Sequence, residues 1–116
     1  MLSSRIAMLL AAILVWSVPV GRTQTPRRIE IIASRFTYTP DEITLKKDET
    51  VVLVMHSADV THGFQLIELN IKAEIKKGKN TEIKFTPAAA GQFVGKCAFF
   101  CGAGHASMML HINVVE

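Results

Sequence analysis

Apolar and polar side chains alternate along much of this 116-residue chain. In the segment EITLKK at 42–47, Ile43 and Leu45 alternate with charged and hydroxyl side chains. The same period of two continues through IKAEI at 71–75 and EIKF at 82–85, on either side of a Lys-Gly-Lys turn. Successive side chains of a β-strand point to opposite faces, so this pattern is typical of half-buried antiparallel strands. We therefore expect an all-β fold.

Three further segments complete the predicted set of strands. TVVLVM at 50–55 is continuously apolar and rich in β-branched residues, which indicates a central strand buried on both faces. RIEIIASRFTYTP at 28–40 and MLHINVV at 109–115 predict a first and a last strand. About eight short strands at this spacing, with no helical periodicity, repeat or linker, predict a Greek-key-like β-sandwich or barrel.

Residues 1–25 have the charge layout of an export signal. Arg5 is followed by an uncharged run over 6–20, which is shorter than the roughly 20 residues of a membrane span and matches a secretory signal peptide. The segment lacks a clear cleavage triplet, so an uncleaved anchor helix with Trp16 at the membrane interface is the alternative. We expect residues 26–116 to be exported to the periplasm, or to be anchored through 6–20 to the outer face of the cytoplasmic membrane.

The charge of the chain excludes one class of partner. Arg5 and Arg22 account for two of the 13 Lys and Arg side chains, so residues 26–116 carry 11 basic and 10 acidic side chains, a net charge of +1. No basic stripe interleaved with aromatic residues remains, and we expect no nucleic-acid binding. The nearly neutral domain also shows no acidic docking face. No triad or carboxylate pair is present in the pattern, so we expect no catalysis by this chain alone.

Side chains that bind soft metals gather in the segment CAFFCGAGHASMM at 97–109. It holds both cysteines of the chain, Cys97 and Cys101, followed by His105 and by Met108 or Met109 as a thioether. The spacing is C-x3-C-x3-H-x2-M, and the whole segment lies between two predicted strands.

Other histidines and methionines of the domain have different expected roles. Met55 lies in the predicted central strand and is expected to be a packing residue. His56 ends that strand, and His111 alternates with inward residues, so both are expected at the surface. His62 begins the predicted strand HGFQLIEL, where it can reach a loop at the same end of the sandwich.

Two interpretations of the cysteines follow from these residues. In an exported protein, C-x3-C alone favours a disulfide between Cys97 and Cys101. Thiolate and imidazole ligands bind copper strongly, and a thioether adds a weak axial bond. The presence of His62, His105 and a methionine therefore favours a copper site over a disulfide. A mononuclear site would leave one cysteine unused. Thioredoxin-fold copper-delivery proteins also combine C-x3-C with a distant histidine, but the βαβ pattern that they need is absent.

The segment DVTHGF, followed later by CAFFCGAGHASM, resembles the copper-A (CuA) domain of cytochrome c oxidase subunit II. It is similar also to the related domain of nitrous oxide reductase. The segments IEIIASRFTYTPDEITLKKDETV and GQFVGKC support this resemblance, which covers residues 29–116. The resemblance implies a cupredoxin-like fold.

The resemblance also implies a dinuclear copper centre with six protein ligands. Cys97 and Cys101 would be bridging thiolates, and His62 and His105 would each bind one copper. Met108 would be a weak axial ligand of one copper, and the main-chain carbonyl of Phe99 that of the other. Oxidases usually carry Glu at the position of Phe99, whereas nitrous oxide reductases carry an aromatic residue there. The bond uses the main chain, so the side chain can differ.

The function implied by the resemblance is electron transfer, from a donor such as cytochrome c to oxidase subunit I or another acceptor. A free-standing periplasmic cupredoxin electron carrier and a copper storage or delivery protein are the alternatives.

Residues around the predicted ligands have expected roles of their own. We expect Phe64, Phe99 and Phe100 to exclude water from the site. Gly102 and Gly104 are expected to let the loop fold tightly. Asp59 is either a hydrogen-bond partner of His62 or only a turn residue.

Overall fold

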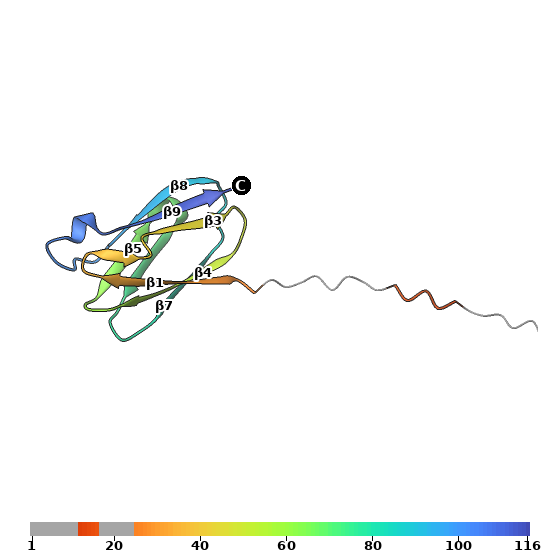
Figure 1. Ribbon diagram of the computed structural model, residues 1–116, viewed down its shortest axis with the longest axis horizontal. Helices are drawn as coiled ribbons and strands as arrows, with labels where there is room; N and C mark the ends of the chain where they lie inside the picture. The colour runs from red at the N-terminus through yellow and green to blue at the C-terminus, as the bar shows by residue number, and fades with distance from the viewer. Residues whose placement is uncertain (1–11, 17–24) are drawn as a thin grey trace, which may run out of the picture.

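The computed structural model describes residues 12–16 and 25–116 (Figure 1). Residues 12–16 are exposed and have no regular secondary structure. Most of the signal peptide or anchor expected over residues 1–25 lies outside the described residues. Within the two described ranges, no helix is long and apolar enough to cross a membrane.

Residues 25–116 form two β-sheets packed face to face, which confirms the predicted all-β sandwich. The four-stranded sheet has the order β2-β1-β4-β7 and comprises β2 (Thr37–Thr39), β1 (Arg27–Ser34), β4 (Val51–Ser57) and β7 (Thr81–Phe85). The five-stranded sheet has the order β3-β9-β8-β5-β6 and comprises β3 (Glu42–Lys46), β9 (Met109–Val115), β8 (Gly91–Lys96), β5 (His62–Leu66) and β6 (Ile71–Ile75). Two short 3-10 helices, η1 (Ile67–Leu69) and η2 (His105–Ser107), interrupt the strands.

The core lies between the sheets and follows the alternation of the sequence. Ile43 and Leu45 of β3 are buried, as are the alternating apolar residues of β9, whereas the residues between them face outward. Every residue from Val51 to Met55 in β4 is buried, because β4 lies between β1 and β7 in its sheet. Met55 is fully buried, as expected of a packing residue, and His111 is exposed. Burial of each large apolar side chain contributes about 1.5–3 kcal/mol.

The pairing of the strands differs from the expectation of antiparallel strands. β1 pairs with β4, and β3 with β9, in parallel. Alternation has the same period in both kinds of ladder, so the pattern of side chains could not distinguish them. The Lys-Gly-Lys turn after β6 leads to β7 in the other sheet.

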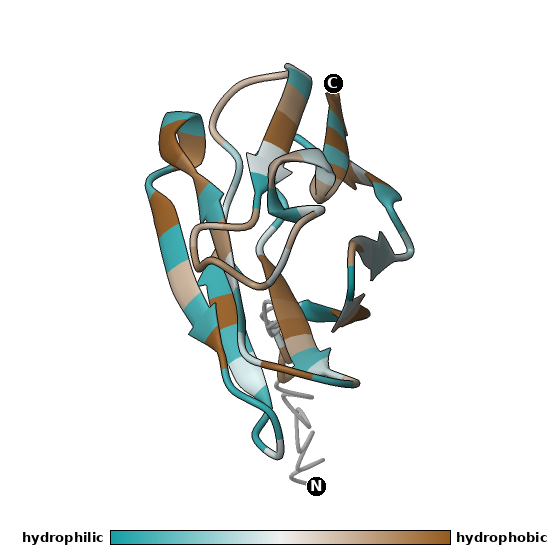
Figure 2. Cartoon of the chain, turned by 90° about the vertical axis from the view of Figure 1, so that its left-hand side faces the viewer, coloured by the Kyte–Doolittle hydropathy of each residue, from teal (hydrophilic) through white to brown (hydrophobic). Residues whose placement is uncertain are grey.

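The segment predicted as one first strand forms two strands. β1 and β2 pair antiparallel, with Ser34 opposite Thr37, because the chain reverses at Arg35 and Phe36. This β1–β2 corner lies at the same end of the sandwich as the loop between β8 and β9, which is blue and carries η2 in Figure 1. Figure 2 looks onto this end, where several loops cross in front of the sheets. The fold thus brings the predicted ligand loop beside the start of β5.

Candidate metal centre

His62 is the first residue of β5 and is fully buried. Its Nε2 lies 2.7 Å from Oδ1 of Asp59. Its Nδ1 is buried and has no hydrogen-bond partner among the described residues. A buried polar atom without a partner costs about 1–3 kcal/mol. The free Nδ1 is therefore the atom that a bound metal would satisfy.

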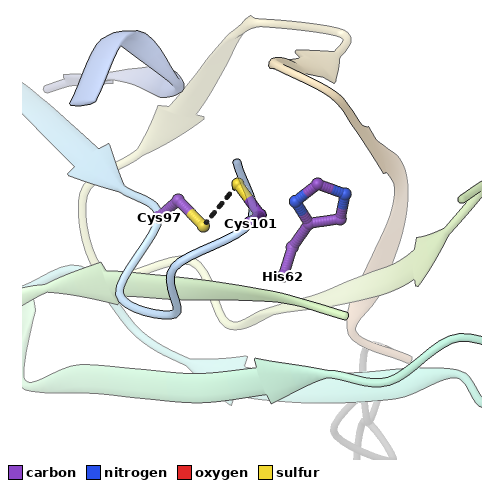
Figure 3. Close-up of side chains that lie close together, drawn as sticks. All are labelled: His62, Cys97 and Cys101. Atoms are coloured by element: carbon purple, nitrogen blue, oxygen red, sulfur yellow. Dashed lines mark hydrogen bonds between the residues drawn. The ribbon is translucent and has the colours of Figure 1, made fainter. Parts of the chain in front are cut away.

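Cys97 and Cys101 lie in the loop between β8 and β9, and both are free thiols in the interior. Their sulfurs are 3.7 Å apart, whereas a disulfide bond is about 2.05 Å long. The disulfide interpretation is therefore wrong for this structure. Figure 3 shows both sulfurs and the His62 ring in one small space. The ligand atoms of these three residues all lie within 4.8 Å of one another.

The other predicted ligands lie around the two sulfurs. Sγ of Cys101 is 3.8 Å from Nδ1 of His105 and 3.9 Å from Sδ of Met108. Sγ of Cys97 is 3.0 Å from the carbonyl oxygen of Phe99. Met109, the alternative thioether, begins β9 and pairs with Lys96 instead. The structure thus brings all six predicted donor residues together.

This set of donors fits copper. Thiolate, thioether and imidazole are ligands that copper prefers, and no carboxylate belongs to the set. Metal–thiolate bonds are about 2.3 Å long, so two sulfurs 3.7 Å apart can bind the same ion. The free Nδ1 of His62 completes the group of His62, Cys97 and Cys101.

Burial also controls the protonation of Cys101 before metal is bound. Burial, and after it the interactions with the neighbouring Cys97 side chain, raise the pKa of Cys101 to about 11. The metal-free site therefore holds a neutral Cys101 thiol near pH 7. A metal that binds there as a thiolate complex must displace the proton.

Asp59 connects His62 to a neighbouring loop. Its Oδ1 accepts hydrogen bonds from the His62 ring and from the main-chain N–H of Val60, and its Oδ2 accepts one from the N–H of Arg35, at 2.7 Å. Burial acts to raise the pKa of Asp59, but these hydrogen bonds outweigh it and hold the pKa below its ordinary value. Asp59 is therefore a partner of His62 as well as a turn residue, which resolves the two expectations.

Gly63 has a role that sequence reasoning missed. Its N–H donates to Sγ of Cys97 at 3.4 Å, and its carbonyl accepts a hydrogen bond from the buried hydroxyl of Tyr38 at 2.6 Å. A Cβ at this position would lie 2.7 Å from the main-chain nitrogen of Phe99. Only a residue without a side chain lets β5 approach the ligand loop so closely. The sequence contains no signal for this contact, since it joins segments far apart in the chain.

The β1–β2 corner also holds the ligand loop. A Cβ on Gly104 would lie 2.4 Å from the ring of Phe36, and Gly102 has a positive φ of 139° beside the same ring. Nε of Arg35 donates to the carbonyl oxygen of Cys101 at 3.2 Å. The expectation that both glycines let the loop fold tightly is confirmed, and Phe36 is the side chain against which they pack.

The expectation that three phenylalanines exclude water from the site is wrong for two of them. Phe64 is fully buried, and its ring packs edge-on against Tyr38 with a centroid distance of 5.7 Å. Phe99 is 46% exposed and Phe100 is 75% exposed, because the loop turns both side chains outward at the end of the sandwich. The ring of Phe100 contacts His105, with a centroid distance of 5.6 Å.

Comparisons with known proteins agree with this fold and this set of residues. The cupredoxin-like domain family matches residues 6–110. A probable cytochrome c oxidase subunit 2 of Streptomyces avermitilis is 37% identical over 72 residues, which are 62% of this chain and 23% of the relative. The cytochrome c oxidase subunit 2 of Thermus thermophilus is 31% identical over 88 residues, which are 76% of this chain and 65% of the relative. The chain thus spans between about a quarter and two thirds of the length of these relatives.

A solved structure shows the same fold. The periplasmic domain of subunit II of cytochrome oxidase from Bradyrhizobium japonicum superposes with a TM-score of 0.73 at 23% identity. The match covers 80% of this chain and 86% of that domain. This chain belongs to the cupredoxin-like family and, within it, resembles the copper-A domain of cytochrome c oxidase subunit II.

Proposed function

We propose that this protein is an electron-transfer domain that holds a dinuclear copper-A centre. The observation that carries the proposal is the pair of buried free thiols, 3.7 Å apart, beside the free Nδ1 of His62. Cys97 and Cys101 would bridge two coppers, and His62 and His105 would each bind one. Met108 and the main-chain carbonyl of Phe99 would be the weak ligands. When bound, the copper pair supplies a one-electron redox couple that needs no open coordination position.

The protein's own residues support such a couple by holding the ligands still. Asp59 accepts a hydrogen bond from the Nε2–H of His62, so Nδ1 carries no hydrogen and is the nitrogen that can bind a metal. The N–H of Gly63 points to Sγ of Cys97 and stabilises negative charge on that sulfur. Cys97, Cys101 and Met108 are almost completely buried, so little water has to reorient when the charge of the site changes. A rigid, dry ligand set is suited to rapid electron transfer.

The partners and the location of the protein are part of the same proposal. We infer that a cytochrome c-like protein donates the electron and that oxidase subunit I or another redox protein accepts it. Names of the relatives support this inference, since they are subunits of cytochrome c oxidases. Residues 1–25 would serve as a signal peptide or as an anchor through 6–20, which places residues 26–116 in the periplasm or at the outer face of the cytoplasmic membrane. Catalysis would belong to the larger complex.

Metal analysis tests the proposed centre. After reconstitution with copper and removal of loosely bound ions, we expect two coppers per chain in the wild-type protein. Cys101→Ser removes one bridging thiolate and should leave at most one copper. One copper per chain in the wild-type protein would contradict the dinuclear proposal and favour a mononuclear site.

Two alternative functions predict different behaviour of the loaded protein. A free-standing carrier would be recovered without an oxidase subunit and would cycle reversibly in a redox titration. A storage or delivery protein would transfer its copper to a metal-free acceptor protein. A centre that keeps its copper in the presence of such an acceptor would contradict the delivery function.

A further inference from the structure

A shallow hollow lies directly beside the candidate metal centre. It has a volume of about 300 Å³ and is lined by residues of the β1–β2 corner, the loop before β5 and the ligand loop, namely Arg35, Val60, Thr61, Phe99, Phe100, Cys101 and Gly102. Cys101 is one of the two proposed bridging residues. A molecule that fills this hollow would therefore contact the wall of the metal site.

The hollow carries both kinds of side chain that concentrate at protein interfaces. Phe99 and Phe100 expose large apolar surfaces on the same loop. Arg35 directs its Nε to the carbonyl of Cys101, and among residues 12–16 and 25–116 no carboxylate pairs with its side chain. The terminal nitrogens of a guanidinium form a fork that matches a carboxylate. Aromatic residues and arginine are the usual anchors of binding sites for other proteins.

Basic side chains are concentrated on one side of the hollow. Lys77 lies near the hollow, because it forms a β-bridge with Ser57, the last residue of β4. Val60, which lines the hollow, lies in the loop that follows β4. Lys77 belongs to the turn 76–79, which contains three exposed lysines in four residues, and none of them has an ion-pair partner in the described part of the chain. The nearby carboxylate of Asp59 already accepts hydrogen bonds from the His62 ring and from the main-chain N–H groups of Val60 and Arg35.

One pair of opposite charges on β6 adds no net charge. Lys72 and Glu74 line a second hollow with Phe99, on the other side of that residue. Two exposed carboxylates, Asp41 and Glu42, also lie at this end, beside the start of β9. The basic side chains are therefore concentrated on one side of the apolar patch, at Arg35 and the turn 76–79, although residues 26–116 as a whole carry a net charge of only +1.

We propose that this end of the molecule is the docking surface for an acidic redox protein, with Arg35 and the exposed phenylalanines as its anchors. The proposal rests on the proposed electron-transfer function and specifies the chemistry of the partner: carboxylates around an apolar patch that covers the partner's own redox group. One electron passes from the reduced partner to the oxidised copper centre, and no proton or bond is transferred. The basic turn 76–79 raises the rate of encounter, since charge complementarity acts mainly on association.

Two small oxidants of opposite charge test the sign of this surface. The reduced, copper-loaded protein is mixed with anionic ferricyanide or with cationic tris(phenanthroline)cobalt(III), each of which removes one electron. We expect the ferricyanide rate to fall as ionic strength rises, and the cobalt rate to rise. A ferricyanide rate that rises with ionic strength, together with a cobalt rate that falls, would overturn the proposal.

A matched pair of double variants tests where on the molecule the proposed docking surface lies. Lys77→Glu with Lys79→Glu should lower the ferricyanide rate about tenfold at low ionic strength, within the range known for electrostatic steering. Lys46→Glu with Lys47→Glu makes the same change of charge at the other end of the sandwich, where Lys46 pairs with Val115 near the C-terminus. An equal loss of rate in both double variants would overturn the proposal, because the effect would then be one of net charge.

A binding experiment on the metal-free protein separates this proposal from the proposed copper function. Isotope-labelled protein is titrated with flavodoxin, an acidic redox protein, and the amide signals are followed by NMR. We expect shifts at Arg35, Phe99, Phe100 and Lys77 and none at Lys47, whether or not the protein binds copper. If flavodoxin shifts no signals, or shifts those around Lys47, the docking surface is wrong even where copper loading succeeds.

Discussion

The two nitrogens of His62 have different surroundings, and this difference determines what the residue can do. Nε2 is bonded to Asp59, which keeps the hydrogen on that nitrogen, and Nδ1 remains free beside the thiols. Neutral imidazole binds a metal through the nitrogen that carries no hydrogen. Asp59 therefore selects the form of His62 that can bind, and it is itself held by the N–H of Arg35.

Replacement of this carboxylate should weaken copper binding without unfolding the domain. Asp59→Asn keeps the size of the side chain but removes its negative charge, so the orientation of His62 is less strongly fixed. We expect the affinity for copper to fall about 10-fold to 100-fold, the usual effect of losing such a partner of a metal ligand. Competition with a copper chelator measures the change.

A carboxylate elsewhere provides the control for this experiment. Asp48 lies in the exposed turn after β3, at the other end of the sandwich, and its positive φ of 65° is tolerated by asparagine. Asp48→Asn should leave the copper affinity unchanged. An Asp59→Asn variant that holds copper as tightly as the wild-type protein would show that Asp59 is only a turn residue.

At the scale of elements, the site depends on how closely β5 approaches the loop between β8 and β9. Gly63 permits a backbone-to-backbone contact, and the hydroxyl of Tyr38 on β2 holds the carbonyl of Gly63 from the opposite sheet. The β1–β2 corner holds the other side of the loop through Phe36 and Arg35. β5 and the β1–β2 corner thus hold the loop that carries the proposed ligands from two sides, and Tyr38 holds β5 in place.

Gly63→Ala should therefore damage the site more than the fold. Its Cβ would meet the main-chain nitrogen of Phe99 at 2.7 Å, so the loop or the strand must move. We expect a loss of about 1–3 kcal/mol in the free energy of unfolding, as for other overpacked positions, and a faster release of copper to a chelator. Chemical denaturation and the rate of copper release measure the two effects.

Gly78→Ala is the control that separates loss of stability from faster release of copper. Gly78 has a φ of 82° and nothing within 4 Å of an added Cβ, so the substitution strains the turn without contacting the site. It should lower stability but leave the rate of copper release unchanged. If both variants released copper equally fast at equal loss of stability, the close approach at Gly63 would have no specific role.

At the scale of the whole molecule, most of the hydrophobic core is independent of the metal centre. Buried apolar residues of both sheets fill the space between them. The loop between β8 and β9, which carries all but one of the candidate ligands, lies at one end of the sandwich (Figure 1). Small metal-dependent domains lack such a core and unfold without their ion. This sandwich has such a core, and of the buried residues that form it only Cys97, Cys101 and Met108 are proposed ligands.

Removal of metal should therefore leave the fold intact. We expect the metal-free protein to give the circular dichroism of a β-sheet protein and a cooperative unfolding transition, with added copper raising the midpoint. Loss of the cooperative transition on chelation would show that the core does not hold the domain together alone.

The sequence was sufficient to predict which residues are buried and which donor residues meet, but not how the strands pair. Alternation at Ile43, Leu45 and Leu110 predicts buried faces, because the period of a strand is the same in every sheet. The spacing of Cys97, Cys101, His105 and Met108 predicts their meeting, because one short loop carries them all. Parallel pairing of β1 with β4 could not be predicted, since it depends on how the chain crosses between the sheets.

The residues that sequence reasoning missed share one physical property. Gly63, Tyr38 and Phe36 act through contacts between segments far apart in the chain, and no local pattern records such contacts. Phe99 and Phe100 were expected to cover the site because they are apolar, but their direction is set by the turn of the loop. Local patterns and the family resemblance thus predicted a set of donor residues that the structure brings together, and the fold determined what surrounds them.

Electron paramagnetic resonance of the copper-loaded, half-reduced protein tests the proposed centre most directly. If the two thiolates share one unpaired electron equally between two coppers, the hyperfine pattern has seven lines, which is the result that we predict. A four-line pattern, which arises from an electron confined to one copper, would contradict the dinuclear centre.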